Sequence, residues 1–573
     1  MDKYDYAQAL IGELKLQRVP FEANWREISD YLLPFRLRMN LSDYGKGDRR
    51  NSNIYNSSAT HALRTLESGF MLSVTNPGDT WFRLKPEDDE AYDFGPVGEW
   101  LDDVASLMMG VFERSNLYLT LPTFYGNFAG FGTAALSLEP HYEGEVIHAR
   151  AIPTGSYWIG QDQYSTVNSF YREFRMTVRQ LKERFPNGDF SLHVREMLES
   201  GKRWEEWIDV GHLVYPNEDY DPESPLAGRK KFGSCWFEIG MSSATSQGSY
   251  LSVTERKFID EGGFDEFPFL VARWALTEGE VYGIDCPGMT CFGDIKSLQF
   301  GEKRSWQAVE KHVNPHWLVP ESLKRAGDKG FIAGDMTYID DTDSGKGIRP
   351  IYEIKPEIQQ LEAKLEQVRK RIFQTLDYDL FRMFDLIEDR ERTAAEISER
   401  RNEKLTQLVP MLGQLHRGVF RPLIDRTFRM MWAQGLIPPP PPELEGKRLT
   451  VEYVGVLAQA QRAAAAGPVE RLIATVLPAV QAMQDPALLD KIEWDNALDV
   501  VATALGAPAR VVRSNDEVAA IRQARAQAQA QAAQLEAMKE GAQAAKNLSQ
   551  ADMGSDNALT RMARMNRAQQ GAA

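Results

Sequence analysis

The apolar stripe between residues 357 and 384 constrains the fold of this chain more than any other feature. Its large aliphatic residues recur every three or four positions, which is the period of one face of an α-helix. They are Ile358, Leu361, Leu365, Val368, Ile372, Leu376 and Leu380. Pro356 suits a helix start, and Glu357 and Glu362 suit the positive end of the helix dipole. The stretch therefore predicts one helix about 40 Å long.

A second helical pattern, residues 288 to 313, precedes the first. Ile295, Leu298, Trp306, Val309 and Val313 lie close to a single stripe. The segment between the two patterns holds short strand-like runs, HWLVP, GFIAG, MTYID and IRPIYEI, among prolines and glycines. The sequence therefore predicts two long helices side by side, joined at one end by a small β module that projects from the body.

The chain before these helices predicts an α+β body. Residues 1 to 130 are mainly helical in pattern, with apolar residues at helical spacing and possible helix caps at Asn56 and Ser58. From 134 to 275 the pattern changes to short runs rich in aromatic and β-branched residues, AALSLEP, EVIHARAIP, SYWIG, SCWFEIG and SYLSVTERKF. Together with the long helices, this predicts a mainly helical α+β fold.

The C-terminal part of the chain predicts further helices. After the charged stretch DLIEDRER, a helix restarts at TAAE and continues with Pro410 and Pro422 inside it, so we expect a kinked helix that ends at Gly435. RLTVEYVG alternates as a strand, and residues 458 to 512 return to helices with alanine-rich faces. Residues 521 to 546 predict a long helix of good helix formers that has no apolar stripe, which leaves open what it packs against.

Composition restricts the class of protein. The net charge of -16 argues against a general nucleic-acid coat and against a protein held to anionic membrane, because both depend on an excess of Lys and Arg. The three cysteines, Cys235, Cys286 and Cys291, cannot form a complete set of disulfides, so we expect a reducing compartment. The N-terminus lacks the apolar core of a signal peptide, and FPFLVARWAL is too short for a membrane span. We expect a soluble, cytoplasmic protein.

Candidate motifs for catalysis and metal binding all fail. GMTCFGDIK carries Asp294 where a phosphate-binding loop needs lysine, and DDTDSGKG lacks the glutamate that closes a calcium loop. Cys286 and Cys291 have no second pair of ligands at zinc spacing. The acidic run PEDDEAYD points consecutive carboxylates in different directions and favours a surface loop over a two-metal nuclease site. We expect no metal, no cofactor and no enzymatic activity.

Four segments carry a resemblance to a known family. They are NSSATHALRTLESGFMLSVTNPGDTWFRL, GEVYGIDCPGMTCFGDIKSL, NPHWLVPE and RTAAEISERRNEKLTQLVPMLGQLHRGVFRPLIDRTFRMMWAQGLIPPPPPEL. In these segments the chain resembles the portal proteins, or head-to-tail connectors, of podovirus-type bacteriophages. The resemblance covers residues from about 20 to about 460, and the region beyond gives no distinctive motif.

The resemblance implies a ring of twelve copies at one capsid vertex, with DNA passing through the central channel during packaging and ejection. Twelve alanine-rich helices around one axis would also give residues 521 to 546 a partner. The implied parts of each chain are a wing (1–287), a first stem helix (288–313), a clip (314–356), a second stem helix (357–384), a channel loop (385–393), a kinked helix and wing strand (394–457), a crown (458–512) and a C-terminal barrel helix with its tail (513–573).

The resemblance also implies a set of partners and a location. The partners are further copies of the chain, double-stranded DNA, the terminase large subunit, tail adaptor and nozzle proteins, and the major capsid and scaffold proteins, without a membrane. The expected location is the portal vertex of the virion, after assembly in the bacterial host cytoplasm.

The resemblance and the charge pattern together predict two sets of site residues. A channel should not grip DNA, because each phosphate neutralised by Lys or Arg adds affinity and many fixed contacts would stall passage. The channel candidates are Arg390, Arg392, Glu388, Asp389, Arg369, Lys370 and Arg371. The last three are consecutive and spread around a helix, so only one or two can face the channel, and the rest would form salt bridges between subunits or a solvated face. The clip candidates for contact with the motor or adaptor are Trp317, Lys324 and Arg325.

Two other classes of protein remain open from the sequence. An elongated helical adaptor or scaffold of the virion fits the helix-rich C-terminal half, but it leaves the strand-rich segment from 134 to 275 without a role. A packaging-associated nuclease would need a convergent set of carboxylates, which the sequence does not display.

Overall fold

The structure is a computed structural model that describes most of the chain. The described residues are 2–43, 47–78, 80–86, 96–141, 144–224, 226–239, 257–315, 317–320, 336–339, 349–350, 358–382, 409–444, 449–453, 472, 493–505, 511–513, 515–549, 561–562 and 564–565.

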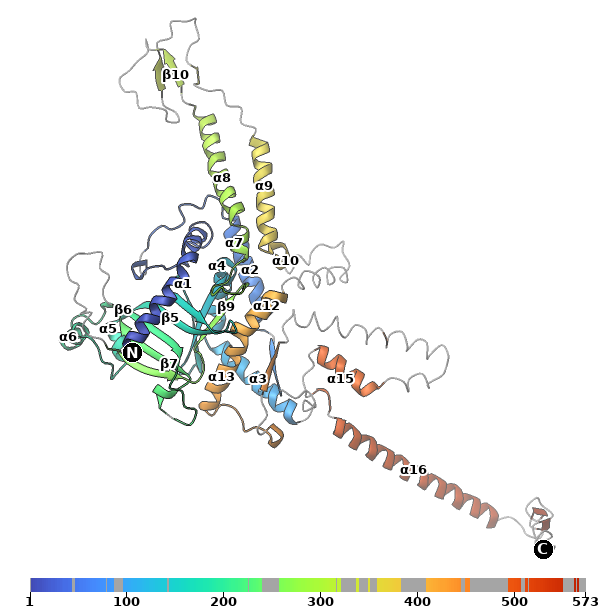
Figure 1. Ribbon diagram of the computed structural model, residues 1–573. Coiled ribbons are helices and arrows are strands. Elements are labelled where there is room, and N and C mark those ends of the chain that lie inside the picture. The colour runs from blue at the N-terminus through green and yellow to red at the C-terminus, as the bar shows by residue number, and fades with distance from the viewer. Residues whose placement is uncertain are drawn as a thin grey trace. The chain divides into compact units, whose positions relative to one another are not determined.

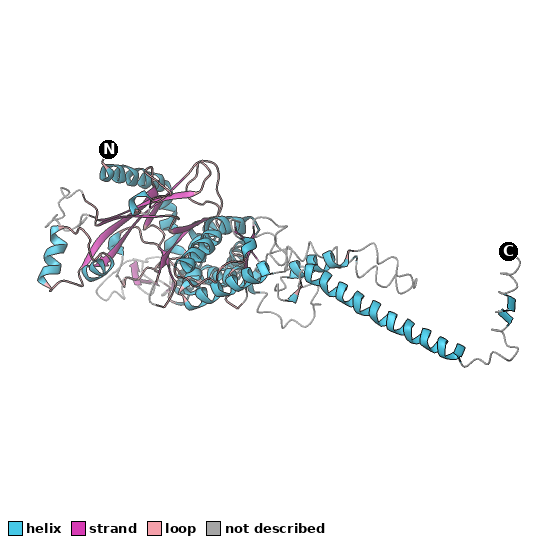
Figure 2. Cartoon of the chain, turned by 90° about the horizontal axis from the view of Figure 1, so that it is seen from below, coloured by secondary structure: helices cyan, strands magenta, loops and turns pink. Residues whose placement is uncertain are grey.

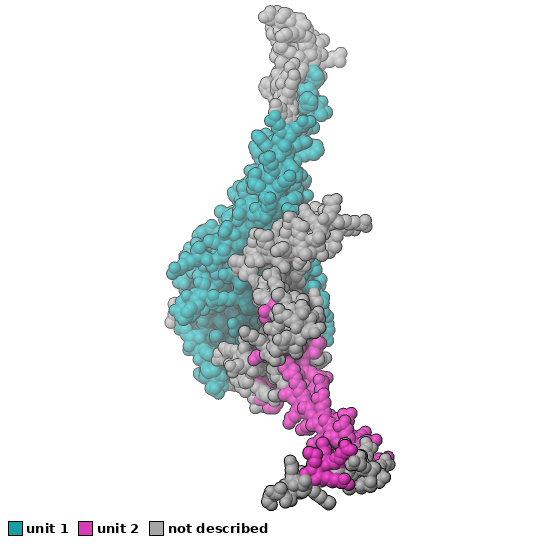
Figure 3. Space-filling model, turned by 90° about the vertical axis from the view of Figure 1, so that its right-hand side faces the viewer, with its two compact units in different colours: residues 1–85, 103–439, 449–468 teal, residues 86–102, 440–448, 469–573 magenta. Residues whose placement is uncertain are grey.

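The chain divides into two compact units (Figure 3). Unit 1 consists of residues 1–85, 103–439 and 449–468, and unit 2 consists of residues 86–102, 440–448 and 469–573. The described strands and the two long predicted helices fall in unit 1, apart from the last residue of one strand. The most C-terminal helices belong to unit 2.

The larger sheet of unit 1 has five antiparallel strands in the order β4-β5-β6-β7-β8. They are β4 (Tyr157–Gln161), β5 (Val167–Thr177), β6 (Trp207–Pro216), β7 (Phe232–Glu238) and β8 (Asp260–Phe264). Each strand pairs with the next along the chain, with two helices inserted between β5 and β6 (strands are magenta in Figure 2). Antiparallel neighbours of this kind can be joined without a long crossover connection.

Helices cover both faces of this sheet. Successive side chains of a strand point to opposite faces, so Tyr171 and Leu213 lie on one face while Val210 and Trp236 lie on the other. Helix α1 (Lys3–Tyr31) packs its residues Ala7, Ile11 and Leu14 against the first face. Helices α5 (Val178–Arg184) and α6 (Leu192–Ser200) bury their apolar residues against the second.

The smaller sheet has three antiparallel strands in the order β3-β2-β9. They are β2 (Thr133–Pro140), β3 (Ile147–Ile152) and β9 (Phe269–Arg273). Helix α4 (Leu117–Phe131) leads directly into β2 through Gly132, whose φ of +76° favours glycine. Helix α2 (Ser58–Val74) packs on α4, and α3 (Pro96–Arg114) lies between them in the sequence.

Two long helices lie side by side in unit 1 and extend beyond the sheets (Figure 1). The first, α8 (Phe292–Val313), follows the short helix α7 (Pro287–Thr290). The second is α9 (Ile358–Thr375), and α10 (Tyr378–Arg382) follows it. The pair matches the two predicted helices except at the ends. The predicted helix from 357 to 384 is interrupted at Asp377, which has a φ of +49°, a conformation that Asp tolerates better than most residues.

Between α8 and α9 lies a three-stranded sheet in the order β11-β10-β12. Strand β10 (Trp317–Pro320) pairs in parallel with β11 (Met336–Ile339) and antiparallel with β12 (Arg349–Pro350). These strands coincide with three of the predicted runs, HWLVP, MTYID and IRPIYEI. The fourth, GFIAG, lies outside the described residues.

A helix with an irregular turn follows in unit 1. It consists of α12 (Val409–Leu415), a π-helical turn (His416–Phe420) and α13 (Arg421–Ala433), and Gly435 follows with a φ of +69°. A kink was expected from Pro410 and Pro422, and the structure describes a π-helical turn directly before α13, whose first turn contains Pro422. Such turns are found frequently at functional sites. The predicted restart of this helix at TAAE lies outside the described residues. Strand β13 (Leu449–Tyr453), within the predicted run RLTVEYVG, then pairs with β1 (Phe82–Pro86).

Unit 2 contains α15 (Trp494–Leu505) and α16 (Asn515–Ser549). Helix α16 has 35 residues and includes the whole alanine- and glutamine-rich stretch, so the helix predicted there is confirmed. None of the helices in the described part of the chain is long and apolar enough to cross a bilayer.

In the body, the sequence predicted four strands and missed five others that the structure describes. AALSLEP, EVIHARAIP, SYWIG and SCWFEIG correspond to β2, β3, β4 and β7. The missed strands are β1, β5, β6, β8 and β9. The first eight residues of SYLSVTERKF lie outside the described part of the chain, and the last two are not in a strand. The mixed, mainly helical α+β class is nevertheless correct.

Candidate functional site

The paired helices α8 and α9 meet along a narrow apolar seam. Ile295 and Leu298 of α8 and Leu365 and Ile372 of α9 are buried. Gly301 of α8 lies beneath Leu365, where a Cβ atom would come within 2.4 Å of a leucine methyl group. The absence of a side chain at this position lets the two helices approach closely.

Ion pairs flank the seam and use two of the three consecutive basic residues of α9. The Arg371 guanidinium donates two hydrogen bonds to the Asp294 carboxylate, at 2.6 and 3.1 Å. These bonds raise the pKa of Arg371. Arg369 lies 2.6 Å from Glu366 and 3.5 Å from Glu302 on α8. Arg369 and Arg371 therefore pair within the chain.

Lys370 is the member of the run that remains available. Its side chain is exposed, and it forms no ion pair with any residue that the structure describes. The sequence predicted salt bridges between subunits or a solvated face for the members that do not face the channel, and the pairs that the structure describes lie instead within one chain. Among the three, Lys370 is the one whose charge the described part of the chain does not neutralise.

Three large apolar side chains of α8 are exposed. Phe300, Trp306 and Val313 have exposed fractions of 61%, 68% and 76%. The stripe predicted for this helix is therefore buried only in its first half, through Ile295 and Leu298. Trp306 and Val313 lie close to one face of the helix, since seven residues make about two turns, and we call this pair the α8 apolar strip. Large apolar side chains gathered on one element are typical of a surface that another protein covers.

The bases of the two helices are held to the body by polar and aromatic contacts. Gln299 of α8 is 2% exposed, and its Oε1 accepts hydrogen bonds from the backbone N–H groups of Tyr55 and Asn56 at 2.7 and 2.8 Å. Its Nε2 donates to the Asn56 carbonyl at 2.7 Å. On the other side, Phe381 packs edge-on to Phe70 of α2. No sequence pattern pointed to Gln299, because a single glutamine on an amphipathic helix is ordinarily a solvated residue.

The remaining predicted site residues are only partly described. Trp317 begins β10 and is half-buried, paired in register with Met336 and Pro350. Lys324 and Arg325 lie outside the described residues, and so do the four loop candidates Glu388, Asp389, Arg390 and Arg392. Of the predicted channel set, the structure therefore places only Arg369, Lys370 and Arg371.

The cysteines are buried thiols. Burial raises the pKa of Cys286 and of Cys291 to about 12, and that of Cys235 to about 11. Such thiols stay protonated at neutral pH and are poor nucleophiles and poor metal ligands. Within the described ranges, no group of three or more His, Cys, Asp or Glu residues is placed to hold a metal ion.

Comparisons with known proteins agree with this architecture. The family model for the bacteriophage head to tail connecting protein matches residues 5–512. The chain is 35% identical over 554 residues to the portal protein of Salmonella phage epsilon15, covering 96% of each chain. It is also 35% identical over 553 residues to a probable portal protein of Bordetella phage BPP-1, again with 96% of each chain covered. Because both matches extend over nearly the whole length, the chain belongs to the bacteriophage head-to-tail connecting protein family.

Proposed function

We propose that this chain is the structural subunit of a phage portal, a ring that forms the DNA channel at one capsid vertex. The observation that carries the proposal is the near full-length similarity to two phage proteins named as portal proteins. Similarity confined to one helical segment would fit many proteins, but 96% coverage includes the sheets, the paired helices and the C-terminal region. In this role the chain acts by assembling into a ring and by holding the DNA channel at the capsid vertex.

The proposed ring gives a function to surfaces that a single chain leaves exposed. The α8 apolar strip would be covered by a neighbouring copy, since an exposed Trp side chain stabilises an interface when it is desolvated. Helix α16 is exposed along its described side chains, apart from the partly exposed Val518. Twelve copies of α16 around one axis would bury its small residues against one another. The paired helices would form the stem, and the β10–β12 sheet would form the clip that docks the terminase and then the tail.

Within the channel, we assign the DNA-facing role to a few basic residues balanced by acids. Lys370 is the candidate on α9, because Arg369 and Arg371 are already paired with carboxylates. Arg390 and Arg392, with Glu388 and Asp389 beside them in the sequence, are the candidates in the predicted channel loop, residues 385–393. A small number of balanced charges permits sliding, because the salt-dependent affinity for DNA grows with every phosphate contacted.

Native mass spectrometry and negative-stain imaging of the purified protein test the proposal. We expect closed rings of about twelve chains with a central hole. As a second step, a phage carrying Arg390→Ala together with Arg392→Ala should assemble portals and package or retain less DNA. A chain that forms no ring even when the scaffold and capsid proteins are co-expressed would refute the portal role. Normal infectivity of the double variant would refute only the channel assignment.

A further inference from the structure

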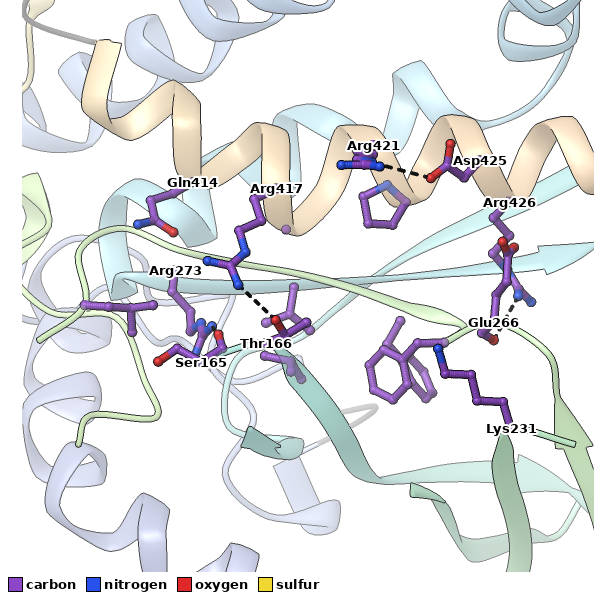
Figure 4. A pocket seen from close by; sticks show the side chains of 17 residues that line it. Ser165, Thr166, Lys231, Glu266, Arg273, Gln414, Arg417, Arg421, Asp425 and Arg426 are labelled. Carbon is purple, nitrogen blue, oxygen red and sulfur yellow. Dashed lines mark hydrogen bonds and ion pairs between the residues drawn. The ribbon is translucent and has the colours of Figure 1, made fainter. Parts of the chain in front are cut away.

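A cavity of about 540 Å³ lies in unit 1 between β9, the start of β5 and the helix that contains the π-helical turn (Figure 4). This volume is within the range of pockets that bind small molecules, about 300 to 1,000 Å³. At one point the helix approaches β9 closely. Gly418 lies against the backbone of Val271, where a Cβ atom would come within 2.3 Å of the carbonyl oxygen.

The lining of the cavity carries an excess of positive charge. Its basic residues are Lys231, Arg273, Arg417, Arg421 and Arg426, and its acidic residues are Glu266 and Asp425. The chain as a whole has a net charge of -16, so the charge around the cavity is opposite in sign to that of the whole chain. Both acids are also engaged by arginines. Glu266 lies 2.8 Å from Arg429, and Asp425 lies 3.9 Å from Arg421.

Arg273 and Arg417 form one basic end of the cavity (Figure 4). Arg273 is buried and donates to Gln161 Oε1 at 2.6 Å, to the Val281 carbonyl at 3.2 Å and to the Ser165 carbonyl. It forms no ion pair with a described carboxylate. Burial, and then the nearby charge of Arg417, lower the pKa of Arg273 to about 10, although Asp162 opposes the change. Arg273 therefore remains charged at neutral pH, and a bound anion would relieve the repulsion between the two guanidinium groups.

Arg417 is held in place by one of its nitrogens and has donors to spare. Its Nη2 donates to the Tyr164 carbonyl at 2.9 Å and to Thr166 Oγ1 at 3.1 Å. Its Nε and Nη1 donate to none of the residues in the described chain. Because a guanidinium group is planar and rigid, these two bonds fix the direction of the remaining N–H groups. Two neighbouring guanidinium groups without ion-paired carboxylates are suited to a phosphate, which accepts bidentate hydrogen bonds.

The lining also contains apolar side chains, Phe267, Phe269 and Pro422 among them. They provide contact area for the organic part of a ligand whose charged group lies between the two arginines. Lys231 lies at the opposite end of the cavity from Arg273 (Figure 4). Its ammonium lies 5.6 Å from the Phe232 ring and forms no ion pair within the described ranges.

We propose that this cavity is a phosphate-binding site that accepts a small phosphorylated molecule, with its phosphate between Arg273 and Arg417. The same chemistry could be supplied by a phosphodiester of DNA, and the two sources differ in the size of the ligand. The proposal does not depend on ring formation, since every residue that it uses belongs to unit 1 of a single chain.

Isothermal titration of the full-length protein with inorganic phosphate, with AMP and with a short double-stranded DNA tests the proposal. We expect saturable binding of phosphate and AMP at one site per chain, and at least tenfold weaker binding to the Arg417→Gln variant. Arg417→Lys should be intermediate, because it keeps the charge and loses the bidentate geometry. Arg525→Gln is the matched control, since Arg525 is an exposed residue of α16 in unit 2. It should bind as the wild type does.

The outcomes separate the possibilities. Binding of DNA that depends on Arg417, without binding of phosphate or AMP, would identify the DNA backbone as the source of the phosphate and overturn the small-molecule assignment. The absence of saturable binding of all three probes at millimolar concentration would overturn the site itself. Equal affinity in the wild type and in a folded Arg417→Gln variant, checked by circular dichroism, would do the same.

Discussion

Glu139 is the anion on which a buried basic network in the body depends. Its carboxylate lies 3.0 Å from Arg184 and 3.3 Å from Arg172, and Arg172 also donates to His212 Nδ1 at 3.3 Å. Burial alone would raise the pKa of Glu139, but Arg184 and Arg172 outweigh it and hold the pKa at about 2. Burial lowers the pKa of Arg172 to about 10, so both partners of the Glu139–Arg172 pair remain charged at neutral pH.

We expect Glu139→Gln to lower the free energy of unfolding by about 3 kcal/mol at pH 7, because it leaves the Arg172 charge buried without its partner. The folded pKa of about 2 lies below the ordinary 4.5, so the ionised carboxylate stabilises the fold above pH 4.5 and this contribution is lost as the pH falls towards 2. Urea unfolding at several pH values should therefore show the wild type and variant converging in acid. Glu205→Gln, which breaks the exposed pair with Arg179, should cost less than about 1 kcal/mol.

Gly418 provides a second test at the scale of one residue. A methyl group at this position would meet the Val271 carbonyl oxygen, which belongs to a strand of the core and cannot move aside as a flexible side chain can. We expect Gly418→Ala to destabilise the protein by about 1 to 3 kcal/mol in thermal or urea unfolding. Gly413, on the same helix, has nothing within 4 Å of the place that a methyl group would occupy, so Gly413→Ala should be neutral or stabilising by up to about 1 kcal/mol. Equal effects of the two variants would contradict this packing argument.

At the scale of elements, the sequence predicted helices α8 and α9 because each carries an apolar stripe at a period of 3.6 residues. It could not predict the break after Thr375, because Leu376 and Leu380 continue the apolar spacing across it. The strands β5 and β6 were missed for a different reason. Charged residues interrupt the apolar pattern of both strands, Arg175 in β5 and Asp209 in β6, yet the structure places these two in an ion pair with each other.

The basic run proposed for the channel could be picked out from the sequence, but its pairing could be foreseen only in part. The three consecutive basic residues of α9 stand out in the sequence, and the expectation that they divide in role follows from helix geometry. Arg371 pairs with Asp294, which is 77 residues away in the sequence, so no local pattern predicts this pair. The pair of Arg369 with Glu366 is local, three positions apart on the helix, and is of the kind that helix geometry predicts. The cationic cavity could not be predicted from a local pattern either, because Arg273 and Arg417 belong to a strand and a helix that are far apart in the sequence.

Trp306 tests the role of α8 as an assembly element. Its side chain is 68% exposed in the single chain, so Trp306→Ser should leave the stability of the fold nearly unchanged. If a neighbouring copy covers it, truncation should weaken assembly by about 2 kcal/mol or more at each interface. Analytical ultracentrifugation over a range of concentrations measures the amounts of single chains and of rings. Arg304→Gln, an exposed change on the opposite face of the same helix, should assemble normally, and rings of Trp306→Ser with wild-type stability would exclude the Trp306 face from the interface.

At the scale of the whole molecule, α16 is an element with little apolar packing in the described chain, although Arg522 forms an exposed ion pair with Asp495 of α15. Its described side chains are almost all exposed in a helix of 35 residues, so it lacks the apolar packing from which most helices in proteins gain their stability. Alanine and glutamine favour the helical state, but their propensity alone makes an isolated helix marginal in water. Association with other copies of the same helix would supply the missing burial, and it would couple the order of this helix to assembly.

Hydrogen–deuterium exchange of the unassembled and the ring-shaped protein tests that coupling. In the unassembled chain we expect the amides of α16 to exchange quickly, because opening the helix breaks no buried contact. In the ring they should exchange at least tenfold more slowly, since each opening would then also separate the helix from its neighbours. Amides of β6 are the internal reference, because this central strand is paired on both sides in every state. Equal exchange of α16 in the two samples would show that rings form without a helical barrel, and it would leave the C-terminal helix free for a different partner.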